Sequence, residues 1–249
     1  MCNRYRAASV TRIRDAFGFT YIESGPPLEE RYHTTGIGPL QPGPFVRRQE
    51  IVVGQWGLTP DRSPTLRPIN QQTNRPMSTN NARWNPARGQ PEARSFWGAW
   101  DRAQRCLVPA DDFDEPYWGH GGPKCIWWRF RRADGAPTML AGLWNEWTDP
   151  ATGEVIPSYT MLTINCNAHP VLAHMHRPDL GPDKQPLPPE EQDKRTVVPL
   201  ERDAWDAWLH GTPTQAAQVI QLPPADLYEH GAVDPEQQVD LLLTHSSAE

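Results

Sequence analysis

The sequence predicts an α+β fold, a single domain of curved, mainly antiparallel, barrel-like sheets with helices at the periphery. Proline is unusually abundant, with 28 residues in a chain of 249, against an average of about 5%. Because proline interrupts helices, this composition favours short strands, turns and loops. The apolar segments are short, and clusters of turn residues separate them. A hydrophobic content of 37% with 11 tryptophans is enough for a sizeable core.

Short segments rich in apolar, β-branched and aromatic residues predict the strands. An Asp134-Gly135 pair separates two of these segments and is a strong hairpin signal. We therefore expect the segments on either side of it to pair with each other. The predicted strands cover residues 51–58, 105–109, 125–131, 138–144, 158–165 and 195–199.

Helices are expected where apolar residues recur at helical spacing. An amphipathic helix is predicted over 92–104, about two helical turns over 168–176, and a helix over 201–210 that stops near a glycine. Two polar, proline-bearing stretches, 61–75 and 178–189, are predicted to be loops. Strands therefore dominate, and the helices are scattered among them.

Composition excludes several classes of protein. No stretch approaches the roughly 20 apolar residues of a membrane span. The first fifteen residues are basic but lack the apolar core of a signal peptide. The four cysteines, Cys2, Cys106, Cys125 and Cys166, have no CxxC spacing, which is typical of free thiols in a reducing compartment. Of these, Cys106 and Cys125 are expected to be buried. We expect a cytoplasmic, nucleoid-associated monomer with no membrane partner.

The charge is distributed unevenly along the chain. The net charge is −6, yet all 24 Lys and Arg lie at or before Arg202. The remaining 203–249 hold eight acids and no base. We therefore expect one domain over 1–230, followed by an acidic, partly disordered tail over 231–249. Local basic surface, rather than total charge, is what phosphate binding requires.

Cys2 is the most informative residue. Cysteine is small enough for the initiator methionine to be removed, which would leave an amine and a thiol on adjacent carbons of Cys2. Their ordinary pKa values are about 8 and about 8.5, so both groups are partly reactive near neutral pH. An amine condenses with an aldehyde, and the neighbouring thiol can then close a five-membered thiazolidine ring. The alternative is a disordered start with an inert thiol.

Three further positions could serve such chemistry, and each has a simpler explanation when taken alone. Asn81 lies in a polar stretch and could be a turn residue. Glu115 follows three aspartates, which is typical of an acidic loop. His176 could be a surface histidine beside a proline break.

Taken together and in this order, these motifs resemble the SRAP family, the SOS-response-associated peptidases that process abasic sites. The resemblance covers roughly residues 1–210. The matching segments are Met1-Cys2-Asn3-Arg4-Tyr5, Trp56-Gly57-Leu58, Asn81-Ala82-Arg83, Arg105-Cys106-Leu107-Val108-Pro109 with Phe113-Asp114-Glu115, and His176-Arg177-Pro178 with Lys194-Arg195.

The resemblance implies a protein that binds single-stranded DNA and captures abasic sites covalently through Cys2, with no cofactor or metal. It implies that Glu115 handles protons at the Cys2 amine, and that His176 assists ring opening and reversal of the cross-link. It implies an orienting role for Asn81. The DNA contacts would come from Arg4, Trp56, Arg83 and Arg177. It also implies strand-cleaving lyase activity and self-removal of Met1.

The chain departs from the family pattern at several positions. Asn3 replaces a glycine beside the nucleophile. Asp112 and Asp114 are expected to raise the pKa of Glu115 by like-charge repulsion. His174 is a rival for the catalytic histidine. For Trp56, a core aromatic at a strand end is nearly as good an interpretation as a base-stacking residue.

Three alternatives remain open from the sequence. The first is an N-terminal-nucleophile cysteine amidohydrolase, in which the Cys2 thiol attacks an amide. The second is a non-catalytic binder of single-stranded DNA. The third is a zinc site built from Cys166, His169, His174 and His176.

Overall fold

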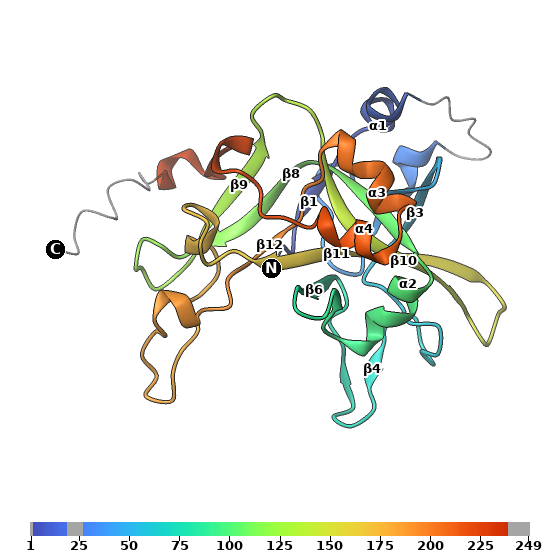
Figure 1. The fold of residues 1–249 in the computed structure, drawn as a ribbon, viewed down its shortest axis with the longest axis horizontal. Coiled ribbons are helices and arrows are strands. Elements are labelled where there is room, and N and C mark those ends of the chain that lie inside the picture. Colours follow the sequence, from blue (N-terminus) through green and yellow to red (C-terminus); the bar gives the residue numbers. More distant parts are fainter. Residues whose placement is uncertain (1, 19–26, 239–249) are drawn as a thin grey trace.

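The centre of the fold is a closed ring of five strands (Figure 1). In the computed structural model, which describes residues 2–18 and 27–238, each strand of this ring is paired with the next and the last with the first. Four of the five seams are antiparallel, and the seam between β3 and β11 is parallel. The predicted α+β fold with a curved, mainly antiparallel barrel is confirmed. In ring order the strands are β8 (Arg105–Tyr117), β2 (Pro42–Arg47), β3 (Glu50–Trp56), β11 (Val155–Asn165) and β10 (Thr138–Thr148).

Two long strands exchange partners along their length, and this opens the ring at one end. The first half of β8 pairs with β10, and its second half pairs with β9 (Ile126–Arg132) and, on the other edge, with β1 (Tyr5–Ala7). Likewise β11 passes from β3 to β6 (Asn81–Asn85) on one edge and from β10 to β12 (Arg195–Val197) on the other. The candidate site lies at this end of the ring, beside β1, β6 and the second half of β8.

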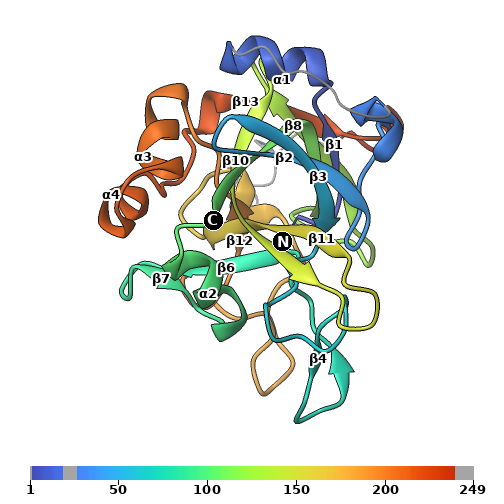
Figure 2. The same ribbon diagram turned by 90° about the vertical axis from the view of Figure 1, so that its right-hand side faces the viewer.

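The remaining strands are short or lie at the edges. β13 (Tyr228–Ala232) extends the sheet beyond β9, and β7 (Gln90–Pro91) pairs with β6. A separate hairpin is formed by β4 (Ile69–Asn70) and β5 (Arg75–Pro76). In both ribbon views this hairpin and the proline-rich loop over 178–189 project from the same side of the barrel (Figures 1 and 2).

The helices are short and lie around the outside of the ring (Figure 2). Helix α1 (Val10–Phe17) begins at Ser9, whose hydroxyl accepts from the backbone of Arg12, and ends at Gly18 in the left-handed region. The other α-helices are α2 (Trp97–Asp101), α3 (Trp205–Leu209) and α4 (Pro213–Gln218). Single 3₁₀ turns are η1 (Leu28–Arg31), η2 (Arg94–Phe96), η3 (Leu172–His174), η4 (Pro189–Glu191), η5 (Arg202–Ala204), η6 (Ala225–Leu227) and η7 (Pro235–Gln237).

The predicted hairpin around Asp134-Gly135 is wrong, although both of its strands exist. Gly135 makes the expected left-handed turn, with φ of +73°. However, β9 and β10 each pair with β8, one after the other along its length. β8 has 13 residues, most of them buried, so one of its edges is long enough to pair with both strands in turn. The turn therefore joins β9 and β10, which lie one after the other along the same edge of β8.

Other predicted elements have different limits. The helix predicted over 92–104 is a 3₁₀ turn followed by the five residues of α2, and the predicted turns over 168–176 reduce to η3. The helix over 201–210 is η5 followed by α3. Glu115 lies in β8, so the acidic loop predicted around it is in fact a strand.

The first part of the predicted tail over 231–249 lies within the described residues. Gly231 and Ala232 belong to β13, and one 3₁₀ turn follows within the described residues. The rest of the predicted tail, 239–249, lies outside the described residues. Across 2–18 and 27–238, the structure has no helix with the length and apolar character needed to cross a membrane.

Candidate active site

The site lies where β1, β6 and β8 meet the segment that follows η3. Cys2 precedes β1, Asn81 begins β6, Glu115 lies near the end of β8, and His176 follows η3. Asn81 Nδ2 donates to the Cys2 carbonyl at 2.8 Å. His176 Nε2 lies 3.2 Å from Glu115 Oε2. The charge of Glu115 acts in turn on the Cys2 thiol. Four residues that are far apart in the sequence therefore converge.

The Cys2 thiol is enclosed. The residue has no exposed surface, and its Sγ donates weakly to the carbonyl of Arg4 at 3.4 Å. Burial raises the pKa of the Cys2 thiol well above its usual value, and the negative charge of Glu115 raises this pKa further. The sulfur is consequently a neutral thiol at pH 7, and proton transfer must accompany its attack on any electrophile.

Two adjacent asparagines fix the N-terminal segment. Besides the bond from Asn81, Asn80 Nδ2 donates to the side chain of Asn3 at 3.2 Å, and the Asn80 carbonyl accepts from the Trp56 indole at 2.9 Å. Ser78 Oγ donates to Asn80 Oδ1 at 2.7 Å. Asn3 is thus held by a side-chain partner. No role was predicted for Asn80, and its position directly before Asn81 was the only signal.

Glu115 is a buried carboxyl on the inner face of β8. Its side chain is 1% exposed, and burial raises its pKa to about 7. The negative charge of Asp114 adds to this rise in pKa. Alternation along a strand directs Asp112 and Asp114 to the opposite face, where both contact Arg129. The pKa of Glu115 therefore moves in the predicted direction, but burial rather than like-charge repulsion is the main cause.

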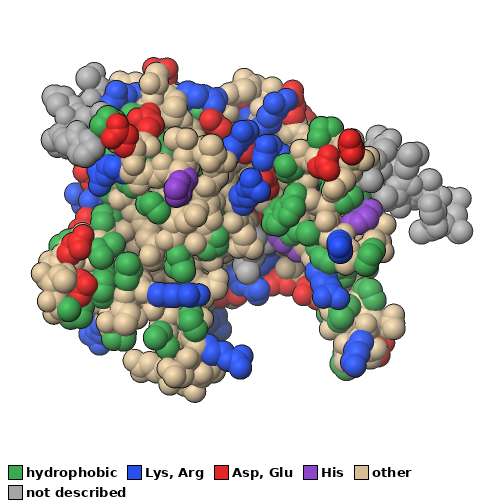
Figure 3. All heavy atoms as spheres, turned by 180° about the vertical axis from the view of Figure 1, so that it is seen from behind, with side chains coloured by type: hydrophobic (Ala, Val, Ile, Leu, Met, Phe, Trp, Pro, Cys, Tyr) green, Lys and Arg blue, Asp and Glu red, His purple; other side chains and the backbone are tan. Residues whose placement is uncertain are grey.

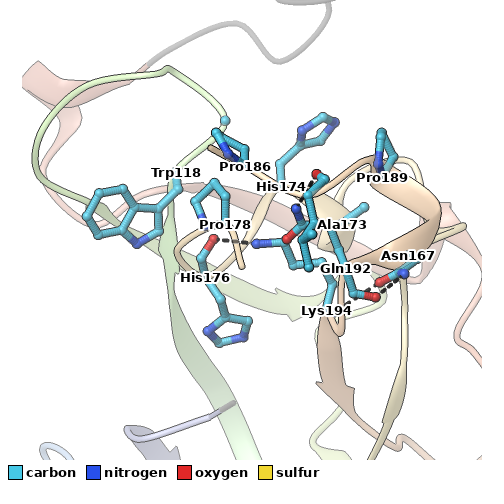
Figure 4. Close-up of a pocket in the computed structure, with 12 residues that line it drawn as sticks. Trp118, Asn167, Ala173, His174, His176, Pro178, Pro186, Pro189, Gln192 and Lys194 are labelled. Carbon is cyan, nitrogen blue, oxygen red and sulfur yellow. Dashed lines mark hydrogen bonds between the residues drawn. The ribbon is translucent and has the colours of Figure 1, made fainter. Parts of the chain in front are cut away.

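His176, rather than His174, faces Glu115. The His176 backbone N–H donates to the carbonyl of Pro116 at 2.6 Å. Burial lowers the pKa of the imidazole to about 3, so the ring is neutral at pH 7. Both His174 and His176 line a pocket of about 280 Å³. Figure 4 shows the His176 ring pointing away from the side of this pocket where His174 lies.

The three predicted DNA-binding arginines are all exposed. Arg4 has a side-chain exposure of 51% and lies 3.5 Å from the buried carboxylate of Asp114. Arg83 pairs with Asp193 at 2.8 Å. The Arg177 guanidinium lies over the Trp118 ring, 5.7 Å from its centroid. Figure 3 shows Lys and Arg side chains gathered near the middle of one face, above a hollow between the two projecting loops.

Trp56 does not share this exposure, and a base-stacking role for it needs correction. Its side chain has no exposed surface and packs edge-on against Tyr5, with ring centroids 5.2 Å apart. Tyr5 in turn shares a short hydrogen bond with Tyr159 across the barrel interior. Trp56 is therefore a core residue that also supports Asn80. This is the alternative interpretation of its position at a strand end.

The expectation that Cys125 is buried also needs correction, because the residue is half-buried.

Replacing Trp56 with alanine is expected to destabilise the fold. Removing a large buried aromatic side chain costs about 3–5 kcal/mol. Urea denaturation followed by circular dichroism would measure this loss. Trp127→Ala is the matched control, because Trp127 is 41% exposed and surface substitutions usually change stability by less than about 0.5 kcal/mol. Equal stability of the two variants would contradict the core assignment.

The residues of the zinc alternative are used in local structure. Cys166 Sγ donates to the carbonyl of Leu172 at 3.7 Å. His169 Nδ1 accepts from the backbone N–H of Leu172 at 3.0 Å. These bonds shape the turn that leads to His176. Within the ranges that the structure describes, no group of three or more His, Cys, Asp or Glu side chains is arranged to hold a metal ion.

Comparison with known proteins identifies the family of this chain. The profile of a family described as SOS response associated peptidase (SRAP) matches residues 1–236. A structure of a protein from Bordetella bronchiseptica is 33% identical, with a TM-score of 0.72, covering 94% of this chain and 100% of that one. No curated protein matches.

Two more distant structures share the fold. A protein from Bacteroides thetaiotaomicron is 17% identical, with a TM-score of 0.68, over 94% of this chain and 93% of that one. A phage-related protein from Bordetella bronchiseptica is also 17% identical, with a TM-score of 0.58, over 93% and 94%. With the profile covering nearly the whole chain and the first structure at 33% identity, this chain belongs to the SRAP family, which associates it with the response to DNA damage.

Proposed function

We propose that the protein binds single-stranded DNA and captures abasic sites covalently through the N-terminal residue that Cys2 becomes once Met1 is removed. The observation that carries this proposal is the convergence of Cys2, Asn81, Glu115 and His176 in one enclosed site. An enclosed site excludes competing water and strengthens each electrostatic contact within it. Such a site suits a step that releases water from an amine and an aldehyde.

The proposed reaction has two bond-forming steps. The Cys2 amine adds to the C1′ aldehyde of the ring-opened sugar, and water leaves to give an imine. The Cys2 sulfur then adds to the imine carbon, and the thiol proton passes to the imine nitrogen. The product is a five-membered thiazolidine that links protein and DNA. Holding the thiol beside the imine is worth about 7–11 kcal/mol of barrier.

The neighbouring residues supply the proton transfers. Glu115, with a pKa of about 7, can both accept and donate a proton near neutral pH. His176 is neutral at that pH and can orient the sugar hydroxyl by a hydrogen bond during ring opening. Asn81 holds the Cys2 carbonyl, which fixes the direction of the amine. The imine also acidifies the C2′ proton, so slow strand cleavage is expected as a side reaction.

The proposal is tested by mixing the purified protein with single-stranded DNA that contains one abasic site. We expect an adduct that survives denaturation and heating and migrates more slowly on a gel. DNA with an intact base at the same position is the control and should give no adduct. Reversible binding of both DNAs without an adduct would instead favour a non-catalytic binder of single-stranded DNA.

A second candidate is an N-terminal-nucleophile cysteine amidohydrolase, and the word peptidase in the family description favours it. In this reaction the Cys2 thiol attacks an amide, and removal of Met1 by the protein itself would be one example. Amide turnover without any adduct on abasic DNA would identify this activity. Intact mass after expression measures Met1 removal directly, because retained Met1 blocks the amine.

Arg177 is expected to contribute to DNA affinity through phosphate contacts. Arg177→Gln should weaken binding of single-stranded DNA and reduce the dependence of log Kd on log salt by about 0.7. Fluorescence anisotropy at several salt concentrations measures both. Arg48→Gln is the matched control, because Arg48 is exposed in the turn at the end of the β2–β3 hairpin remote from Trp56. Equal effects of the two substitutions would point to non-specific attraction.

A further inference from the structure

The backbone of His176 adopts a conformation that few side chains tolerate. Its φ is +63°, in the left-handed region. A residue other than glycine held in this region costs about 1–3 kcal/mol and persists only where surrounding contacts fix it. The peptide at this position needs such contacts because the direction of the imidazole toward Glu115 depends on it.

Lys194 supplies two of these contacts. Its ammonium donates to the His176 carbonyl at 2.9 Å and to the Arg177 carbonyl at 3.0 Å. Figure 4 shows the Lys194 side chain reaching toward His176 from the side opposite the imidazole, with the bond to the His176 carbonyl drawn. The ammonium thus binds the backbone carbonyls of the turn, while the imidazole of the same turn points toward Glu115.

Lys194 is itself rigidly placed. The residue is 7% exposed, although lysines are almost never buried unless they are paired. Its backbone N–H donates to the side chain of Asn167 at 2.9 Å, and its carbonyl accepts from Cys166 at 2.7 Å. It directly precedes β12, which is paired with β11 of the ring. The barrel therefore positions the lysine, and the lysine positions the turn.

We propose that Lys194 is a positioning residue for His176, and that its ammonium holds the His176–Arg177 turn so that the imidazole meets Glu115. This inference rests on the proposed function for the role it gives His176, but the contacts themselves do not. The positive charge of Lys194 also opposes protonation of the ring and so helps to lower the pKa of His176. Burial remains the main cause of the low pKa of His176, and the contribution of Lys194 adds to it.

The test compares Lys194→Met with Lys194→Arg, since arginine keeps a charged donor and methionine removes it. Release of the cross-link from abasic DNA should slow by about 10- to 100-fold in Lys194→Met and recover in part in Lys194→Arg. Lys184→Met is the matched control, because Lys184 is exposed in the same loop, and it should release at the wild-type rate. Circular dichroism would establish that each variant is folded.

A double mutant separates positioning from general stability. In a His176→Ala background, Lys194→Met should change the release rate by less than about twofold, because residues that act as a unit are not additive. A wild-type release rate in folded Lys194→Met, or a full further loss in the His176→Ala background, would overturn the proposal.

A measurement on the free protein keeps this inference distinct from the proposed function. The pKa of His176, followed by NMR of its imidazole signals, should rise toward its ordinary value in Lys194→Met and stay low in Lys184→Met. If wild-type protein forms no adduct, the proposed function fails, and this titration still decides whether Lys194 positions the ring. An unchanged pKa of His176 in Lys194→Met would contradict the positioning role.

Discussion

Replacing Cys2 with alanine is expected to abolish the heat-stable adduct with abasic DNA. The variant keeps an N-terminal amine and can still form an imine, but it has no thiol to close the ring. Because the imine hydrolyses readily, the yield of surviving adduct should fall by at least about 10³-fold, a fraction of what intramolecular ring closure contributes. A denaturing gel after heating measures this yield.

A serine at position 2 refines the same experiment. Cys2→Ser should form an imine that borohydride reduces to a stable amine, while without borohydride little adduct should survive heating. This pattern would separate the contribution of the amine from that of the thiol. An adduct formed by Cys2→Ala at the wild-type yield would mean that another nucleophile, such as a lysine, captures the aldehyde.

Cys125→Ala is the matched control for loss of a thiol. Cys125 is half-buried, whereas Cys2 is fully enclosed, so simple accessibility favours Cys125 as the reactive thiol. The wild-type yield in Cys125→Ala would show that placement beside Glu115 and the amine matters more than exposure. Intact mass should further show adduct only on molecules that lack Met1.

Four of the five ring strands, β3, β8, β10 and β11, were predicted at least in part, because each contains a short apolar segment. The fifth, β2, was not predicted, because it begins with Pro-Gly-Pro, which is typical of a turn. Which strands pair with each other was harder to predict from the sequence. The Asp134-Gly135 turn signals a hairpin locally, but the choice of partner depends on β8, whose length becomes visible only when its apolar residues are followed past Pro109. Long-range pairing is decided by total burial, which no local pattern contains.

The segment around Glu115 was interpreted as an acidic loop, although its sequence contains the alternating pattern of a strand. Phe113, Glu115 and Tyr117 alternate with Asp114 and Pro116, and a period of two is typical of a strand. Asp112 and Asp114 masked this pattern, because aspartates are ordinarily solvated. In the structure they are buried beneath Arg6 and Arg129, and the carboxyl of Glu115 is directed inward. Ion pairs with Arg6 of β1 and Arg129 of β9, the strands on either side of this part of β8, made the acidic strand feasible.

The role of Lys194 had no comparable signal. It stands beside Arg195 in a motif that the sequence marks, but its contacts are with backbone carbonyls of a turn in the left-handed region. Sequence patterns report side-chain types and do not report the conformation of a remote backbone. Positioning residues of this kind are therefore found only once the fold is known.

Replacing Glu115 with glutamine is expected to slow adduct formation and to remove its dependence on pH near 7. Glutamine keeps the shape of the side chain but cannot take up a proton, and general acid–base catalysis contributes about 10²–10⁴-fold. In the wild type the rate should rise with pH through about 7, as Glu115 ionises and can accept a proton from the Cys2 amine. Single-turnover rates from pH 5.5 to 8.5 would measure both effects.

Glu115→Gln is expected to slow the reaction but to make the protein more stable than the wild type at high pH. The folded-state pKa of Glu115, about 7, is above the ordinary 4.5, so its contribution to stability is fully present below pH 4.5 and is lost as pH rises through 7. One pKa unit is worth about 1.4 kcal/mol, so the wild type should lose up to roughly 3 kcal/mol over this range relative to the glutamine variant. Urea denaturation at pH 4.5 and pH 8 would measure the difference.

Glu229→Gln is the matched control, because Glu229 is 54% exposed on β13 and its replacement should change stability by less than about 0.5 kcal/mol. A Glu115→Gln variant that is more stable at pH 8 and slower would mean that the buried carboxyl is kept for chemistry at the expense of the fold. A variant that is more stable and equally fast would remove Glu115 from the mechanism. The two measurements therefore decide whether its raised pKa serves the reaction or only accompanies its burial.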